Sequence, residues 1–232
     1  MRRLGLLGGM SWESSVEYER IINEYVRDEV GGVASADLII RSFNFADIEA
    51  LQATGQWDRA GRVLADAAVD LRSGGAEAIV ICTNTMHLLV DDIESAVDIP
   101  VLHIADATAA AVKAADIDVV GLLGTRYTME KDFYAGRLAD RHGLEVLVPD
   151  EHDRTRVHEV IYDELVAGVI SEASREAYLA VIDRLVERGA QGVIAGCTEI
   201  ELLVRPEHVS VPYFPTTRLH AEAAARFALG VD

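Results

Sequence analysis

The chain is poor in cysteine and aromatic side chains, and it has no long hydrophobic run. Of its 232 residues, two are cysteines and 6% are aromatic. Two cysteines are too few for the disulfide framework of a small secreted scaffold. No apolar stretch reaches the roughly 20 residues that span a bilayer. Glycines also interrupt the segment Met1–Gly9 before a signal-peptide core can form. We therefore expect a cytoplasmic protein without a membrane segment.

Positive charge is scarce as well. The 21 lysines and arginines face 39 acidic residues, which gives a formal net charge of −18. Such a surface repels nucleic acid and anionic membranes, so neither is an expected partner. An anionic ligand needs a local pocket lined by cations or amides. Because half of the residues are hydrophobic, the chain can bury a full core in one large or two small domains, which excludes a disordered protein.

Several cofactor signatures are missing. The only lysines, Lys113 and Lys131, fall in expected helices and do not suit a pyridoxal Schiff base. The segment Gly5–Gly9 lacks the full dinucleotide fingerprint. Neither a cysteine pair nor a histidine cluster has the spacing of a metal site, and His152 with His158 is typical of a solvated helix pair. We expect an activity that needs no cofactor and no metal.

Short apolar runs alternate with amphipathic segments from end to end. This pattern is typical of an α/β protein with mainly parallel strands. The helix after the first strand should begin near Ser11 or Ser14, where Ser14 and Glu17 resemble a capping box, and should end at Gly31. The expected strands are residues 3–8, 38–43, 78–82, 101–104, 119–124, 145–148, 192–197 and 211–214.

Three sequence blocks occur twice in the same order. They are the pairs 5–8 and 121–124, 75–80 and 189–194, and 99–101 and 211–213, at shifts of 116, 114 and 112 residues. The constant order and nearly constant spacing favour a duplicated half. We therefore expect two similar α/β lobes related by a pseudo-twofold axis, formed by residues 1–103 with 214–232 and by residues 104–213. A ligand cleft at the carboxyl ends of the strands follows from such an arrangement.

The repeat register assigns positions to the two cysteines. Extending the middle block sets Thr83 against Cys197 and Cys82 against Gly196. In a fold with a pseudo-twofold axis, equivalent residues approach a central ligand from opposite faces, which suits the transfer of a proton across a carbon. A helix N-terminus beside Cys197 would lower the pKa of its thiol and make it a base. The alternative interpretation is that Cys197 is a small apolar residue buried in the core. Cys82 should point into the packing layer, because successive strand residues face opposite sides.

Five motifs are spread along the chain. They are Gly8-Gly9-Met10-Ser11-Trp12-Glu13, Cys82-Thr83-Asn84-Thr85-Met86-His87, Leu102-His103-Ile104-Ala105-Asp106, Gly124-Thr125-Arg126-Tyr127-Thr128-Met129 and Gly196-Cys197-Thr198-Glu199-Ile200. Together they resemble the cofactor-independent aspartate/glutamate racemase family, in its branch of L-aspartate/glutamate-specific or broad-specificity amino-acid racemases. The resemblance implies two α/β lobes, an active site between them, a small amino acid as substrate and a homodimer.

One catalytic position departs from the family pattern. The family carries a cysteine in each half, whereas this chain has Thr83 in the first. A threonine hydroxyl cannot be stored as an anionic base at neutral pH, but it can donate or relay a proton. We expect Cys197 to deprotonate one enantiomer, Thr83 or a water that it holds to reprotonate the opposite face, and the reverse reaction to be slow.

Other candidates surround this pair. Asn84, Thr85 and Thr198, with backbone N–H groups of the two helix starts, suit an α-carboxylate and the enediolate charge that forms when the α-proton leaves. Glu199 binds the α-ammonium, orients Cys197 or only caps a helix.

The resemblance also adds Met10 and Gln52 as pocket residues, for which the alternatives are packing and a solvated loop. His87 has either a structural or an orienting role.

The recognition of an acidic side chain is less defined. Some aspartate racemases carry a lysine where this chain has Val166, which leaves Arg126 or another arginine as a substitute. Two other functions remain open. One is a decarboxylase or isomerase of the same superfamily with a single catalytic thiol. The other is an amino-acid-binding protein without turnover.

Overall fold

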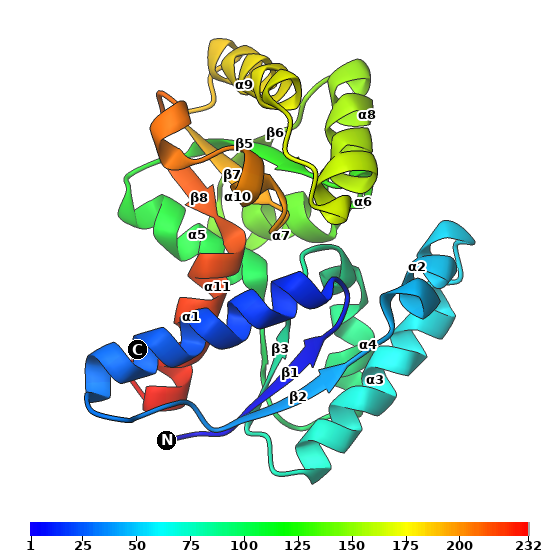
Figure 1. Cartoon of the computed structure of the whole chain (residues 1–232), viewed down its shortest axis with the longest axis vertical. Helices are drawn as coiled ribbons and strands as arrows, with labels where there is room; N and C mark the ends of the chain where they lie inside the picture. Colours follow the sequence, from blue (N-terminus) through cyan, green and yellow to red (C-terminus); the bar gives the residue numbers. More distant parts are fainter. Residues whose placement is uncertain (232) are drawn as a thin grey trace. The chain divides into compact units, whose positions relative to one another are not determined.

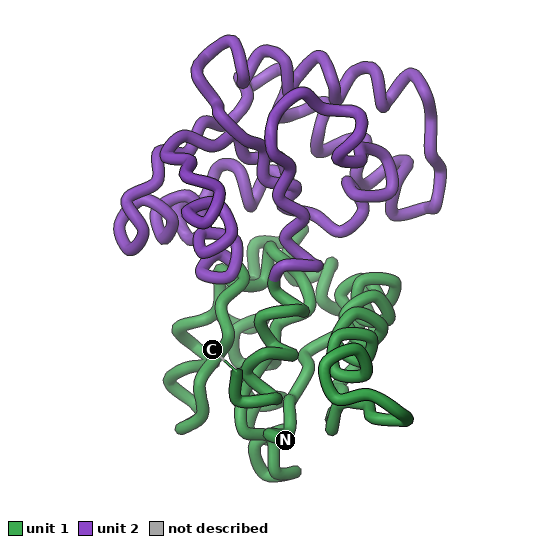
Figure 2. The backbone as a smooth tube through the Cα atoms, turned by 90° about the vertical axis from the view of Figure 1, so that its left-hand side faces the viewer, with its two compact units in different colours: residues 1–104, 220–232 green, residues 105–219 purple. Residues whose placement is uncertain are grey.

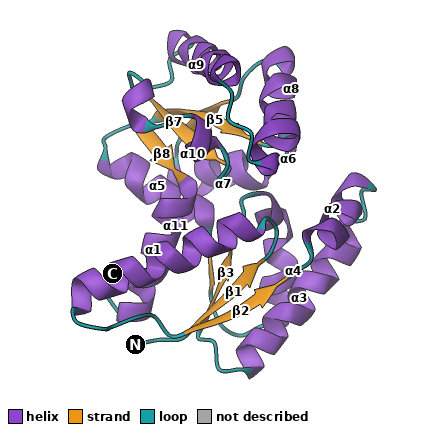
Figure 3. Ribbon diagram, viewed as in Figure 1, coloured by secondary structure: helices purple, strands orange, loops and turns teal. Residues whose placement is uncertain are grey.

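The computed structural model describes residues 1–231. The chain forms two compact units. Unit 1 consists of Met1–Ile104 and the C-terminal segment from His220 onward, and unit 2 consists of Ala105–Leu219. Figure 2 colours the two units separately. Each unit is built on its own sheet, with helices on both faces (Figures 1 and 3).

Unit 1 contains a parallel sheet with the strand order β2-β1-β3-β4. Its strands are β1 (Leu4–Gly8), β2 (Leu38–Ser42), β3 (Ala78–Ile81) and β4 (Val101–Leu102). Its helices are α1 (Trp12–Val30), α2 (Phe45–Ala53), α3 (Trp57–Ser73), the 3-10 helix η1 (Thr85–Leu89) and α4 (Val90–Ala96). The chain leaves this unit at α5 (Ile104–Ala114) and returns to it within α11 (Thr216–Leu229).

Unit 2 contains a second parallel sheet with the order β6-β5-β7-β8. Its strands are β5 (Val119–Gly124), β6 (Glu145–Leu147), β7 (Gly192–Gly196) and β8 (Tyr213–Pro215). Its further helices are α6 (Arg126–Glu130), α7 (Asp132–His142), α8 (Glu151–Glu159), the π-helix η2 (Val160–Glu164), η3 (Leu165–Ala167), α9 (Glu172–Glu187), α10 (Ile200–Leu203) and η4 (Pro206–His208). All eight expected strands form, and the two sheets have the same order, which confirms the predicted fold class.

The central strands of unit 1 bury both of their faces. Leu4 and Leu6 of β1 pack in one core cluster with α1 and α11, whereas Leu7 packs in another with α3 and α4. Burying a leucine or isoleucine side chain contributes about 1.5–3 kcal/mol each. Cys82 is fully buried on the α1 side together with Val80, as the alternation of strand residues predicted.

The N-cap of helix α1 is Ser11 and not Ser14. Ser11 is the N-cap, because its hydroxyl accepts the N–H of Ser14 at 3.5 Å, and Gly31 ends the helix with φ +85°. The predicted capping box of Ser14 and Glu17 is wrong. Ser14 lies buried in the first turn, and Glu17 pairs with Arg20 on the exposed face.

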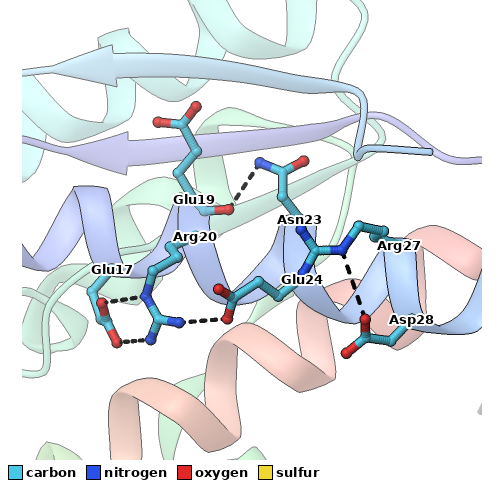
Figure 4. Close-up of polar contacts among 7 residues, drawn as sticks. All are labelled: Glu17, Glu19, Arg20, Asn23, Glu24, Arg27 and Asp28. Atoms are coloured by element: carbon cyan, nitrogen blue, oxygen red, sulfur yellow. Dashed lines mark hydrogen bonds and ion pairs between the residues drawn. The ribbon is translucent and has the colours of Figure 1, made fainter. Parts of the chain in front are cut away.

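The exposed face of α1 carries a short ladder of charges (Figure 4). Arg20 bridges Glu17 and Glu24, and Arg27 lies 3.8 Å from Asp28. Exposed ion pairs of this kind contribute about 0.3–0.5 kcal/mol each. The buried stripe of α1 therefore holds the helix in place, and the charges keep its outer face hydrated.

A glycine in the central strand of each unit allows the end of a helix and the turn after it to pack closely on the sheet. A Cβ on Gly5 would lie 2.9 Å from Ala76 Cβ and 3.1 Å from Leu71 Cβ. A Cβ on Gly121 would lie 3.0 Å from a terminal methyl of Leu185. Leu71 with Ala76 and Leu185 with Ala190 are also joined by matching backbone hydrogen bonds of 3.0 Å. The repeated Gly-Leu-Leu-Gly blocks therefore serve the same packing role in both units.

We expect Gly5→Ala to destabilise the protein by about 1–3 kcal/mol, because the methyl group meets two rigid Cβ atoms. Gly121→Ala is the matched control and should cost less, since a leucine methyl can turn away. Urea unfolding of both variants measures the difference. Equal midpoints would contradict this account of the packing.

Candidate functional site

Thr83 and Cys197 follow corresponding strands of their own units. In unit 1, Leu7 of β1 pairs with Ile81 of β3, and Thr83 comes two residues later. In unit 2, Leu123 of β5 pairs with Ala195 of β7, and Cys197 comes two residues later. The register predicted from the sequence repeat thus has a counterpart in strand pairing. Each side chain lies just beyond the carboxyl edge of its sheet, where ligands of α/β proteins bind.

Thr83 has a fixed backbone and a free hydroxyl. Its N–H donates to Ile81 O at 2.9 Å, and its carbonyl accepts from His87 Nδ1 at 2.8 Å. The side chain is half-buried, and within residues 1–231 its hydroxyl has no hydrogen-bond partner. This leaves the hydroxyl available to a bound molecule.

His87 holds the backbone of Thr83. It is fully buried, and its Nε2 accepts the N–H of Ile104 at 3.2 Å, so its proton is on Nδ1. Burial, followed by the nearby His103 and His220, holds the pKa of His87 well below its ordinary value. The neutral ring therefore bridges the carbonyl of Thr83 to the start of α5.

Asn84 and Thr85 continue directly from Thr83. Both are buried, and the carbonyl of Asn84 accepts the N–H of His87 at 3.1 Å. The segment from Thr85 is a 3-10 helix of five residues. This compact turn places two polar residues directly after Thr83 in the chain.

Met10 and Gln52 are both buried in unit 1. Met10 packs in the core cluster that contains Met86, which agrees with the packing alternative. Gln52 is only 6% exposed on α2, and its Nε2 lies 3.0 Å from Met86 Sδ. The solvated-loop alternative for Gln52 is therefore wrong. Through Met86, Gln52 contacts the segment that carries Thr83.

Cys197 is hydrogen-bonded to a carboxylate. Its Sγ donates to Glu199 Oε2 at 2.8 Å. Burial, followed by the negative charge of Glu199, raises the pKa of the Cys197 thiol well above its ordinary value. The expectation of a lowered pKa is wrong, because α10 has only four residues and the carboxylate is a closer and fuller charge than a helix terminus.

Glu199 is a partner of the thiol and does not cap a helix. It occupies the N-cap position of α10 without a side-chain capping bond and is 8% exposed. Its neighbour Thr198 lies 3.0 Å from Thr217, hydroxyl to hydroxyl, and Thr216 donates to Ala195 O at 2.8 Å. These contacts hold the end of β7 against the start of α11.

The other thiol belongs to the core. Cys82 and Cys197 are both free, and burial raises the pKa of Cys82. No group of three or more His, Cys, Asp or Glu side chains that could hold a metal ion occurs within residues 1–231. In the same part of the chain, no helix is long and apolar enough to cross a membrane.

The sequence analysis missed a polar and aromatic cluster in unit 2. His158 is half-buried and accepts the N–H of Arg126 at 3.3 Å, so its description as part of a solvated pair is wrong. The Tyr162 ring packs against it at a tilt of 55°, with ring centroids 4.7 Å apart. Val166 is 37% exposed in η3. The signal that could have found the cluster is the i, i+4 spacing of His158 and Tyr162.

Iodoacetamide should modify Cys197 and leave Cys82 unmodified in the native protein. Because the pKa of Cys197 is raised, its alkylation should be slow near pH 7 and should accelerate as the pH rises. Glu199→Gln removes the adjacent charge, lowers this pKa and should increase the rate at pH 8. Mass spectrometry of the digested protein locates the adduct, and modification of Cys82 first would contradict the observed burial.

Known proteins share this fold and sequence pattern. A model of the Asp/Glu/hydantoin racemase family matches residues 7–224. A Yersinia pestis protein assigned as an Asp/Glu racemase is 55% identical, with 99% of this chain and 100% of that chain covered and a TM-score of 0.94. An aspartate racemase homologue from Pyrococcus horikoshii OT3 is 32% identical, with coverage of 99% and 100% and a TM-score of 0.86.

A curated relative adds a sequence comparison. The broad specificity amino-acid racemase of Bacillus subtilis is 22% identical over 169 residues, which are 72% of this chain and 71% of that protein. The family match extends over nearly the whole chain and includes both strand ends that carry Thr83 and Cys197. The chain therefore belongs to the Asp/Glu/hydantoin racemase family.

Proposed function

We propose that the protein is a cofactor-independent amino-acid racemase that acts on aspartate, glutamate or a related small amino acid. The observation that carries the proposal is the matched placement of Thr83 and Cys197, each just beyond the corresponding strand of a repeated unit. Racemisation needs one group that removes the α-proton and another that returns a proton from the opposite face. Two equivalent positions in a duplicated fold suit this requirement.

Cys197 is the proposed base. Its thiol proton is shared with Glu199 Oε2, so the carboxylate can accept that proton when substrate binds. The thiolate then takes the α-proton, and the electron pair of the broken C–H bond moves into the α-carboxylate. Hydrogen-bond donors stabilise the resulting enediolate charge. We assign this part to Asn84, Thr85 and Thr198.

Thr83 is the proposed acid on the other face. Its hydroxyl donates a proton, directly or through a water, and recovers one from solvent, while the Cys197–Glu199 pair releases to solvent the proton that it has gained. Because a hydroxyl is a far weaker acid than a thiol, Thr83 is a poor base for the reverse reaction. We therefore propose unequal initial rates from the two enantiomers, while the equilibrium ratio stays unchanged.

The relatives support the substrate class. One is assigned as an Asp/Glu racemase, one is an aspartate racemase homologue, and one is a racemase of broad specificity. We propose an acidic amino acid as the principal substrate and a homodimer as the assembly, following the family resemblance. Two free thiols suit the reducing cytoplasm, where we place the reaction.

Incubation of each pure enantiomer in deuterated water tests the function. A racemase incorporates α-deuterium and forms the opposite enantiomer, which NMR and chiral chromatography detect. Dialysed protein treated with a chelator should retain this activity. Release of carbon dioxide from an α-carboxylated substrate without inversion would indicate the decarboxylase alternative, and binding without exchange would indicate a non-catalytic protein.

Replacing the proposed base should separate chemistry from folding. Cys197→Ser should preserve the fold and reduce α-proton exchange by at least about 10²-fold, because a hydroxyl replaces the thiolate. Circular dichroism provides the folding control. If this variant exchanged the α-proton at nearly the wild-type rate, Cys197 would not be the base.

A further inference from the structure

Arg126, His158 and Tyr162 form a cluster at the carboxyl edge of the unit 2 sheet. The N–H of Arg126 donates to His158 Nδ1 at 3.3 Å. The His158 ring lies 4.7 Å from the Tyr162 ring and 6.4 Å from the Tyr127 ring, centroid to centroid. Tyr162 lies in the π-helical segment Val160–Glu164, a type of turn that is frequent at functional sites. The imidazole is thus fixed by one hydrogen bond and two rings.

The Nε2–H group of His158 is a hydrogen-bond donor. Because Nδ1 accepts a backbone N–H, the proton of the neutral ring is on Nε2. Among the described residues, Nε2 has no hydrogen-bond partner. Burial and then the charge of Arg126 lower the pKa of His158, against the opposing effects of Glu130, Glu159 and Asp163. The ring therefore stays a neutral donor near pH 7.

Arg126 supplies a positive charge that, within the described residues, forms only a long ion pair with Glu130. Its guanidinium is exposed and lies 4.0 Å from Glu130 Oε1. The same oxygen is closer to Arg154, at 3.1 Å. An exposed ion pair at this distance contributes little free energy, so it does not fix the position of the Arg126 side chain. Arg126 can therefore turn to another carboxylate.

The segments that carry Arg126 and the proposed base follow paired strands of one unit. Gly124 of β5 pairs directly with Gly196 of β7. Arg126 follows two residues after Gly124, and Cys197 follows immediately after Gly196. Adjacent strands lie about 4.8 Å apart, so the two segments leave the sheet side by side. A dicarboxylic amino acid with its α-carbon near Cys197 can extend its side chain toward the cluster.

We propose that the Arg126 guanidinium and the His158 Nε2–H bind the side-chain carboxylate of an acidic substrate. This inference rests on the proposed function and names the residues that select glutamate or aspartate over their neutral analogues. Val166 offers no charge for this task. On a chain with a net charge of −18, a local cation is needed to attract an anionic side chain.

Kinetics with glutamate and glutamine test the selectivity. Arg126→Gln should reduce kcat/KM for glutamate by about 10–100-fold, the effect of losing one charge-assisted hydrogen bond. His158→Phe should reduce it by about 10-fold. Both changes should act mainly on KM. Arg126→Gln should lower kcat/KM for glutamine much less than for glutamate, because a neutral amide gains little from the positive charge, whereas His158→Phe should weaken both substrates, because the Nε2–H can donate to either oxygen. Arg141→Gln, which removes a charge from α7 of the same unit, is the control and should change neither substrate.

Ligand binding separates this inference from the proposed function. Calorimetry with Cys197→Ser protein compares glutarate, which has two carboxylates, with butyrate, which has one. Arg126→Gln should weaken glutarate binding at least about 10-fold and leave butyrate unchanged. If the wild-type protein catalyses no exchange while this difference persists, the function fails and the subsite stands. Equal effects on both ligands, or no glutarate binding before substitution, would overturn the subsite.

Discussion

The close packing of a helix end on a glycine of the central strand is the constraint on which both units depend. Gly5 and Gly121 leave no side chain between the strand and the turns at Ala76 and Ala190. Each turn fixes where the next strand, β3 or β7, begins and therefore its register in the sheet. Since β3 and β7 have the same register against their neighbours, the residues after them hold equivalent positions. A packing requirement of the core thus determines where the candidate chemistry lies.

The thiol and the hydroxyl at these positions have different surroundings. Cys197 shares its proton with Glu199, and the same carboxylate that raises the pKa of the thiol is its nearest proton acceptor. Thr83 has no such partner in the described chain, but its carbonyl is held by the buried, neutral His87. Cys197 can therefore pass its proton to a neighbouring carboxylate and regain it. Thr83 has a fixed backbone but, within residues 1–231, no neighbouring side chain that takes its proton, so it must exchange that proton with substrate or solvent.

Much of the fold could be predicted from the sequence, because hydrophobic periodicity and repeated turns are local signals. All eight strands and the burial of Cys82 followed from them. The pKa of Cys197 could not be predicted, since it depends on the burial of the thiol and on the direction of the Glu199 side chain. The environment of His158 could be predicted only in part. Its i, i+4 spacing with Tyr162 is visible in the sequence, but its hydrogen bond to the N–H of Arg126, 32 residues away, depends on the tertiary structure.

The central claim is that Thr83 and Cys197 are the equivalent groups for opposite faces of the substrate. Initial rates from each pure enantiomer, measured for wild-type and Thr83→Cys proteins, test it most directly. A second thiol should accelerate the slow direction more than the fast one, within an unchanged equilibrium ratio, and Cys82→Ala should leave the directional ratio unchanged. Loss of turnover in Cys82→Ala together with full activity of Thr83→Ala would contradict the account and assign the second role to Cys82.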